Sequence, residues 1–160
     1  MLNRNFQEFV RLLGAHGVKY LVVGGYAVGF HGYPRYTGDI DIFVAISPEN
    51  AERLAQVFKE FGFPNSVVGE WFLERDSSIA IGEPPQRIHI VTGIAGVTFD
   101  ECFPNRRYFQ SEGVMVPFIG IEALIKTKEA LKRDQDELDL KRLRRLREIE
   151  SKGHRRSRAE

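Results

Sequence analysis

The stretch Leu21–Val44, with the sequence LVVGGYAVGFHGYPRYTGDIDIFV, contains the features that decide the fold. Its first residues, Leu21–Val23, have the length and composition of a buried strand. Gly24 and Gly25 follow, and glycine allows a sharp turn and a close approach of the backbone to a ligand. The segment Tyr26–His31 can then form one or two helical turns, whose first N–H groups favour an anion. The stretch therefore predicts a strand, a turn and a short helix that together could hold a phosphate.

A second predicted strand, Asp39–Val44, places two carboxylates on one of its faces. Because side chains alternate along a strand, Asp39 and Asp41 share a face, about 7 Å apart along the chain. Ile40 and Ile42 point the other way, into the core. Two like charges this close are unfavourable unless a cation neutralises them, and a divalent cation with oxygen ligands does so. The pattern therefore predicts a metal-binding carboxylate pair close to the glycine turn.

The composition is that of an ordinary soluble globular protein. Of its 160 residues, 42% are hydrophobic and 28% are charged, which suits one domain with a sizeable core and a small appendage. No apolar run approaches the ~20 residues of a membrane span, and the opening MLNRNFQEF lacks the apolar segment of a signal peptide. The single cysteine, Cys102, excludes an internal disulfide framework. We therefore expect a cytoplasmic protein that makes no membrane contact and has no zinc-type ligand cluster.

The net charge of +1 is unevenly distributed along the chain. Residues 141–160 contain nine Lys or Arg and three acidic residues, a charge of +6, which leaves −5 for residues 1–140. A run of this kind is most often a solvated helix and tail, but it can also bind RNA phosphates. We expect 144–160 to be a basic, partly disordered tail, since Ser151–Glu160 has nothing to bury.

The rest of the chain alternates predicted helices with short predicted strands. The predicted helices begin near Asn5, Ser47, Thr98, Ile121 and Asp134, and the one from Ser47 has Pro48 at its first position. The predicted strands are Lys19–Val23, Ile79–Ile81, Arg87–Val91 and Val114–Phe118, with weaker candidates at Val67–Val68 and Trp71–Leu73.

Three segments carry a family resemblance. An apolar-Gly-Gly pattern is followed, after 13 residues, by Asp39-Ile40-Asp41, and this resembles the signature of the nucleotidyltransferase superfamily that includes DNA polymerase beta. More narrowly, GGYAVGFHGYPRYTGDIDIFV resembles small bacterial nucleotidyltransferases related to AbiEii-type toxins and minimal nucleotidyltransferases. RIHIVTGIAGVTFDE and IEALIKTKEALKRDQDELDL are similar to family segments of the types RIDLLTGIDGVSFEE and LEDLIKNKRAAGRPKDLADL. The resemblance covers roughly residues 1–143.

The resemblance implies an α+β fold, with a mixed sheet flanked by helices and a closing helix from about residue 121. Residues 1–143 would form a nucleotidyltransferase-like domain. Enzymes of this superfamily transfer a nucleoside monophosphate from an NTP to a hydroxyl and release pyrophosphate. The implied cofactor is Mg²⁺, with Mn²⁺ as an alternative, and the implied acceptor is a protein or an RNA. For a member of a toxin–antitoxin pair, a cognate antitoxin is the implied partner.

The resemblance also assigns site residues by matching position. The glycine turn would contact the triphosphate, and the two aspartates would bind the metal. Arg35 precedes the acidic pair as in relatives, and a guanidinium is a suitable phosphate partner. Lys128 in the closing helix would reach the triphosphate or orient the acceptor. The residues assigned to nucleotide or phosphate are Gly24, Gly25, Arg35, Thr37 and Lys128, and those assigned to metal are Asp39 and Asp41.

The chain departs from the family at the third carboxylate, where relatives have Asp and this sequence has His89. Strand alternation places His89 on the face opposite Ile88 and Ile90, as a ligand would require. Imidazole is a poor ligand for Mg²⁺ but suits Mn²⁺ or Zn²⁺. Three interpretations follow: altered metal use, binding with weakened catalysis, or a role for His89 as a base. The chain is thus either a nucleotidyltransferase with Asp39, Asp41 and His89 as catalytic residues, or a catalytically reduced relative that binds a nucleotide or a partner and regulates it.

Overall fold

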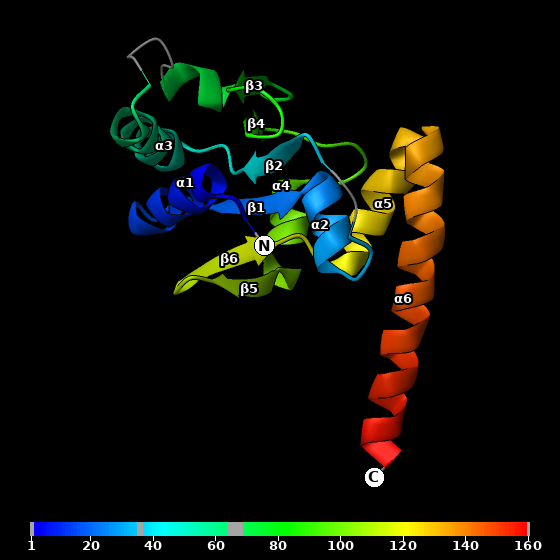
Figure 1. Ribbon diagram of the computed structural model, residues 1–160. Coiled ribbons are helices and arrows are strands. Elements are labelled where there is room, and N and C mark those ends of the chain that lie inside the picture. The colour runs from blue at the N-terminus through cyan, green and yellow to red at the C-terminus, as the bar shows by residue number, and fades with distance from the viewer. Residues whose placement is uncertain (1, 35–36, 64–68, 160) are drawn as a thin grey trace.

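The computed structural model describes residues 2–34, 37–63 and 69–159, and these form a six-stranded mixed sheet flanked by helices (Figure 1). The strand order is β3-β4-β2-β1-β6-β5, and the pairs β1–β6 and β2–β4 are parallel while the others are antiparallel. The expected α+β fold is therefore confirmed. The strands are β1 (Tyr20–Val23), β2 (Asp39–Val44), β3 (Ser78–Ile81), β4 (Arg87–Val91), β5 (Arg107–Ser111) and β6 (Val114–Phe118).

Several of the helices begin at a residue whose side chain caps them. Asn3 accepts a hydrogen bond from the N–H of Phe6, two residues before the predicted cap at Asn5, and Ser47 accepts one from Asn50 as predicted. The α-helices are α1 (Arg4–Ala15), α2 (Gly24–Phe30), α3 (Pro48–Phe61), α4 (Phe99–Cys102), α5 (Ile121–Leu131) and α6 (Asp134–Ala159), and the 3₁₀ helices are η1 (Gly69–Leu73) and η2 (Phe103–Asn105).

Aromatic contacts show which helices cover which face of the sheet. On one face, α1 packs against α3 through Phe9 and Phe58, whose ring centroids are 5.9 Å apart. On the other face, Phe43 of β2 meets Phe99 of α4 at 5.2 Å. Asp39, Asp41 and Phe43 are each two residues apart on β2, so their side chains point to the same face of the sheet. Helix α4 covers this face at Phe43. The core thus leaves the start of β2 open for a site.

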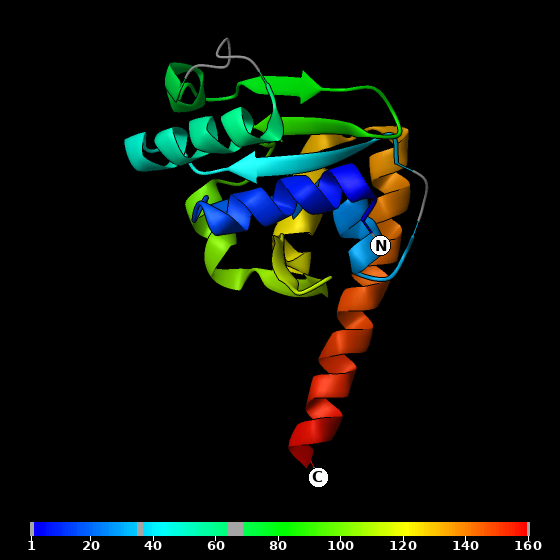
Figure 2. The same cartoon turned by 60° about the vertical axis from the view of Figure 1, so that its left-hand side comes forward.

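The last helix, α6, extends well beyond the sheet and its other helices (Figures 1 and 2). Its first half packs through Leu140 and Leu143, which are buried, whereas residues 148–153 are exposed. The sequence predicted a partly disordered tail over 144–160, whereas in the structure α6 continues to Ala159. Extension of a helix that has already formed costs little free energy per residue, and the Lys, Arg and Glu residues of this segment are good helix formers.

One predicted strand is not observed, and one observed strand was not predicted. Trp71–Leu73 belongs to η1 instead of a strand, where a helical turn buries Phe72 against Phe58. The edge strand β5 was not predicted, because both of its faces are largely exposed and only Ser111 is buried. Val67–Val68 lies outside the described residues. Within the described ranges, no helix combines the length and apolarity needed to cross a membrane.

Candidate functional site

Neighbouring strands bring three potential metal ligands together. In the parallel pairing of β2 with β4, Asp41 lies opposite His89, and Asp39 lies opposite Arg87. One ligand atom from each of Asp39, Asp41 and His89 lies within 4.8 Å of the others. We call these three residues the acid cluster. Their side chains are 28%, 25% and 32% exposed, so the cluster opens to solvent.

The acid cluster carries more negative charge than its own groups neutralise. His89 Nδ1 donates a hydrogen bond of 2.9 Å to Asp41 Oδ1, and this bond raises the pKa of His89 against the opposing effect of burial. The pKa of Asp39 is also raised, first by burial and then by the charge of Asp41. Both shifts show that a further positive charge, whether a proton or a cation, is favoured here.

A divalent cation fits this donor set. Two ligands on opposite sides of Mg²⁺ are about 4.2 Å apart, because each Mg–O distance is about 2.1 Å. The 4.8 Å limit within the acid cluster is close to this value, so small side-chain movements would place all three ligands around one ion. Asp39 and Asp41 would supply oxygen, and His89 would supply nitrogen once its proton has left.

Gly24 makes room for the acid cluster at the end of β1. Its φ of +69° is a conformation that glycine adopts readily, and a Cβ added there would come within 2.2 Å of Asp41 Oδ2. The short helix α2 starts at this residue and has no side-chain cap, which leaves its first N–H groups unpaired by side chains. The glycine turn and the carboxylate pair, predicted separately from the sequence, are thus in direct contact.

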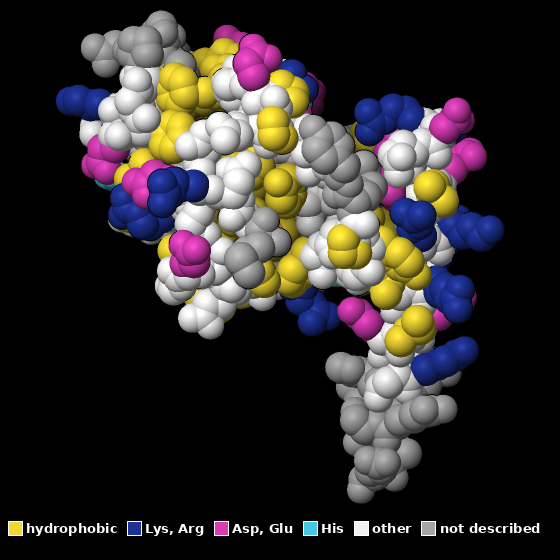
Figure 3. Space-filling view, viewed as in Figure 1, with side chains coloured by type: hydrophobic (Ala, Val, Ile, Leu, Met, Phe, Trp, Pro, Cys, Tyr) yellow, Lys and Arg dark blue, Asp and Glu magenta, His cyan; other side chains and the backbone are white. Residues whose placement is uncertain are grey.

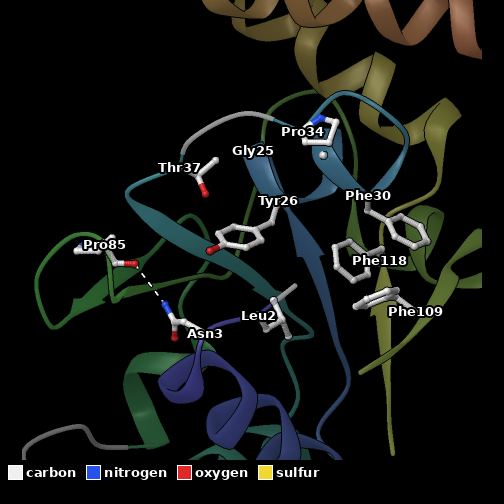
Figure 4. A pocket seen from close by; sticks show the side chains of 11 residues that line it. Leu2, Asn3, Gly25, Tyr26, Phe30, Pro34, Thr37, Pro85, Phe109 and Phe118 are labelled. Carbon is white, nitrogen blue, oxygen red and sulfur yellow. Dashed lines mark hydrogen bonds between the residues drawn. The ribbon is translucent and has the colours of Figure 1, made fainter. Parts of the chain in front are cut away.

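Two of the residues assigned to phosphate line a different part of the site. Gly25 and Thr37 border a cavity of about 720 Å³ (Figure 4), whose walls are mainly apolar. Figure 4 shows Tyr26 projecting into this cavity, with Phe109 and Phe118 along one side. These two phenylalanines lie on the face of the sheet opposite the acid cluster. None of the three residues of the acid cluster lines this cavity. Arg35 lies outside the described residues.

Lys128 lies inside the protein, and two aspartates of α6 bind it. Its side chain is 5% exposed, and Nζ is 3.1 Å from Asp136 Oδ1 and 3.2 Å from Asp139 Oδ2. Arg133 Nε donates to the other oxygen of Asp136 at 2.7 Å. We call Lys128, Arg133, Asp136 and Asp139 the ion cluster. The ammonium group of Lys128 is therefore held within the ion cluster, and the phosphate role assigned to it stays a prediction.

Arg133 is a candidate functional residue that the sequence interpretation missed. Its pKa is raised mainly by the hydrogen bond to Asp136, and the charge of Asp41 adds to the shift. The Arg133 guanidinium is therefore within electrostatic reach of the acid cluster, and its side chain is 67% exposed. The only signal in the sequence is its position at the break between two predicted helices, near residue 134.

Arg87 is a second missed candidate. Its Nε lies 3.7 Å from Asp39 Oδ2, too far for a hydrogen bond, and this atom is buried without a partner among the described residues. A buried N–H without an acceptor is costly, so an acceptor delivered by a ligand would be favourable here. The sequence placed Arg87 on the correct strand but gave no sign of this role.

Solved structures that are similar to this chain include two with nucleotidyltransferase-type descriptions. A candidate nucleotidyltransferase from Thermotoga maritima aligns with 95% of this chain and 92% of its own, at 16% identity and a TM-score of 0.49. An antigenic nucleotidyltransferase-like protein from Paracoccidioides brasiliensis aligns with 89% of this chain and 74% of its own, at 15% identity and a TM-score of 0.52. The second similarity shows a nucleotidyltransferase-like fold. No family model matches the chain, and no curated protein matches it.

Proposed function

We propose that this protein is a metal-dependent nucleotidyltransferase, which transfers a nucleoside monophosphate from an NTP to a hydroxyl of a protein or RNA acceptor. The narrower resemblance to AbiEii-type toxins and minimal nucleotidyltransferases adds the proposal that it acts in a toxin–antitoxin pair. A cognate antitoxin would then be a partner. The observation that carries the proposal is the acid cluster, which has surplus negative charge and lies against Gly24 in a nucleotidyltransferase-like fold.

Asp39 and Asp41 are the proposed metal ligands, with Mg²⁺ or Mn²⁺ as the ion. Such an ion would neutralise charge on the triphosphate and on the attacking and leaving oxygens. The chain's own task is to hold the carboxylates in place, which the backbone pairing of β2 with β1 and β4 achieves. His89 is proposed either as a third ligand or as the base that accepts the acceptor's proton, because its Nδ1 reaches Asp41.

The proposed phosphate contacts come from three places around the acid cluster. Gly24 and Gly25 offer backbone N–H groups at the start of α2. Arg133 and Arg87 lie near Asp41 and Asp39, where guanidinium groups would bind phosphate oxygens. The remaining proposed contacts are Arg35, Thr37 and Lys128, of which Lys128 would act through Asp136 on Arg133.

One observation favours a second function, that of a catalytically reduced protein which binds a nucleotide or a partner and regulates it. His89 lies beside Asp41 at the position where the resemblance implies a third carboxylate, and imidazole is a weaker Mg²⁺ ligand than a carboxylate. Binding of a metal and a nucleotide is compatible with both functions. Release of pyrophosphate with a genuine acceptor would occur only with the first.

The test is transfer of label from each α-labelled NTP, with Mg²⁺ or Mn²⁺, into the protein and RNA fractions of a lysate. We expect label in one fraction together with pyrophosphate release, and loss of both in Asp41→Asn. Asp100→Asn is the matched control, since it removes an exposed carboxylate from α4. Binding of metal and NTP without transfer under any condition would support the second function instead. Metal binding that is unchanged in Asp41→Asn would contradict the site assignment itself.

A further inference from the structure

The outer part of α6 is a basic helix that packs against little else. Leu146 still packs against the core, and beyond it the helix projects away from the sheet (Figures 1 and 2). Residues 141–153 contain six Lys or Arg and two Glu, a net charge of +4. A space-filling view shows Lys and Arg side chains along this helix (Figure 3). This concentration contrasts with the net charge of −5 over residues 1–140.

The six basic residues of 141–153 fall into two groups. The first group consists of three arginines, each of which contacts a described residue outside α6. Arg142 lies 5.5 Å over the ring of Tyr33, Arg144 lies 3.8 Å from Glu129, and Arg147 lies 3.3 Å from Glu122.

The second group is Lys141, Arg145 and Lys152, which we call the basic stripe. These side chains are exposed and make no hydrogen bond or ion pair with another described residue. Their spacings of four and seven residues place them on one side of the helix, over about 16 Å at 1.5 Å per residue. The basic stripe is therefore a row of exposed positive charges on the side of α6 opposite Leu143, and with Glu148 on the same side it carries a net charge of +2.

The chemistry of the stripe favours a polyanion over a membrane surface. A helix that lies on a membrane needs a broad apolar face. Among the described residues of α6 after Leu146, the only large apolar side chain is Ile149. Positive charges in a row match the repeated phosphates of a nucleic acid backbone.

We propose that the basic stripe binds the phosphate backbone of RNA. The proposal rests on the proposed function, because RNA offers the hydroxyl acceptors that nucleotidyl transfer requires.

Glu148 provides an internal check on this assignment. It is exposed on the same side of α6, between Arg145 and Lys152, and would repel a phosphate backbone that follows the stripe. Removal of this charge should therefore strengthen RNA binding. If the helix instead bound a protein partner that recognised Glu148 together with its basic neighbours, loss of the Glu148 charge would weaken that binding.

The test is binding of a fluorescent RNA hairpin with a single-stranded 3′ end, measured by anisotropy over a series of salt concentrations. The triple variant K141Q/R145Q/K152Q should bind at least about tenfold more weakly at low salt. Its slope of log affinity against log salt should fall by about 2 to 3, at about 0.7–0.9 per phosphate contact. Glu148→Gln should bind more tightly than the parent. Glutamine is a good helix former, and circular dichroism would verify that α6 is kept.

The matched control is R4Q/K59Q/R75Q, which removes three exposed positive charges from other parts of the surface. Equal losses of affinity in the two triple variants would overturn the proposal, because the effect would then reflect net charge alone. A second variant, which lacks residues 152–160, removes four Lys or Arg beyond the packed part of α6. It should also weaken RNA binding, and unchanged affinity would count against the stripe.

Competition experiments separate RNA from other polyanions. RNA should displace the labelled hairpin at lower concentrations than DNA of the same sequence or polyglutamate of the same charge. If either competitor performs as well as RNA, the assignment to RNA is wrong. Asp39→Asn separates this proposal from the proposed function, since it should bind RNA as the parent does while it loses metal binding. If the parent protein binds RNA but transfers no nucleotide, the proposed nucleotidyl transfer is refuted and RNA binding by the basic stripe is supported.

Discussion

The acid cluster and the ion cluster differ in how their charges are balanced. In the ion cluster, Lys128 and the two aspartates are at most 5% exposed, and Lys128 with Arg133 balances both carboxylates. In the acid cluster, Arg87 lies 3.7 Å from Asp39 and His89 hydrogen-bonds Asp41, but the pKa of Asp39 is still raised, and all three side chains of the cluster are a quarter to a third exposed. A buried cluster must be neutralised by the protein itself, whereas a solvent-facing cluster can keep surplus charge for a ligand. The comparison distinguishes a structural cluster from a binding cluster.

The largest expected effect comes from removal of the cation of the ion cluster. Lys128→Met leaves two buried carboxylates facing each other and should lower the free energy of unfolding by about 3–5 kcal/mol. Urea denaturation measures this directly. Lys126→Met, at an exposed position of the same helix, is the control and should change stability by less than about 0.5 kcal/mol. A loss below about 1 kcal/mol for Lys128→Met would mean that the ion cluster is not structural.

The ion cluster should also make the protein sensitive to acid. Burial would raise the pKa of Asp136, but hydrogen bonds from Arg133 and Lys128 outweigh it and hold the pKa at about 2. Because this value is below the ordinary ~3.9, the stabilisation is present at neutral pH and is lost as pH falls from about 4 to about 2. We expect a loss of about 2 kcal/mol over this window. Urea denaturation at several pH values should show a smaller loss in Asp136→Asn, and an equal loss would contradict the assignment.

Changes at His89 should alter metal affinity without unfolding the protein. His89→Asp completes a set of three carboxylates and should raise Mg²⁺ affinity about tenfold, within the 10–100-fold range of ligand-sphere effects. His89→Ala should weaken Mn²⁺ binding more than Mg²⁺ binding, since imidazole suits Mn²⁺ better. Titration calorimetry measures both affinities. Equal metal affinities in parent, His89→Asp and His89→Ala would exclude His89 as a ligand.

The same residue predicts a pH dependence for the protein without metal. The pKa of His89 is raised by its hydrogen bond to Asp41, so the pair stabilises the fold below pH ~6.5. This contribution is lost as pH rises through the raised pKa. A metal ion competes with the same proton, so metal affinity should increase over this range. In His89→Ala the stability difference between pH 6 and pH 8 should become smaller, and an unchanged difference would exclude the pair as its source.

The smallest expected effect is a gain in stability at the acid cluster. Ionised Asp39 is unfavourable in the folded protein, because burial and the charge of Asp41 raise its pKa. Asp39→Asn should therefore stabilise the metal-free protein by less than about 1 kcal/mol at pH 7, with no gain below about pH 4. Thermal unfolding with and without Mg²⁺ measures this, with Asp100→Asn as control. A clear loss of stability in metal-free Asp39→Asn would show that the acid cluster, like the ion cluster, is structural.

Local patterns predicted much of the fold from the sequence. The strand Asp39–Val44 and the helix start at Ser47 and Pro48 were predicted at the observed residues, because alternation and capping depend on near neighbours. The strand β5 and the turn η1 were not predicted, because they form through contacts with residues that are distant in the sequence. The packing of the first half of α6 also depends on such contacts.

The candidate site was predicted in part. The sequence alone determined that Asp39 and Asp41 share one face of a strand and that a glycine turn precedes them, since both follow from backbone geometry over a few residues. Only the tertiary structure decided that His89, 48 residues away, hydrogen-bonds Asp41, and that Lys128 is enclosed by two aspartates. Strand register and helix packing join residues distant in sequence, and the charge balance of each cluster is fixed only when those residues meet.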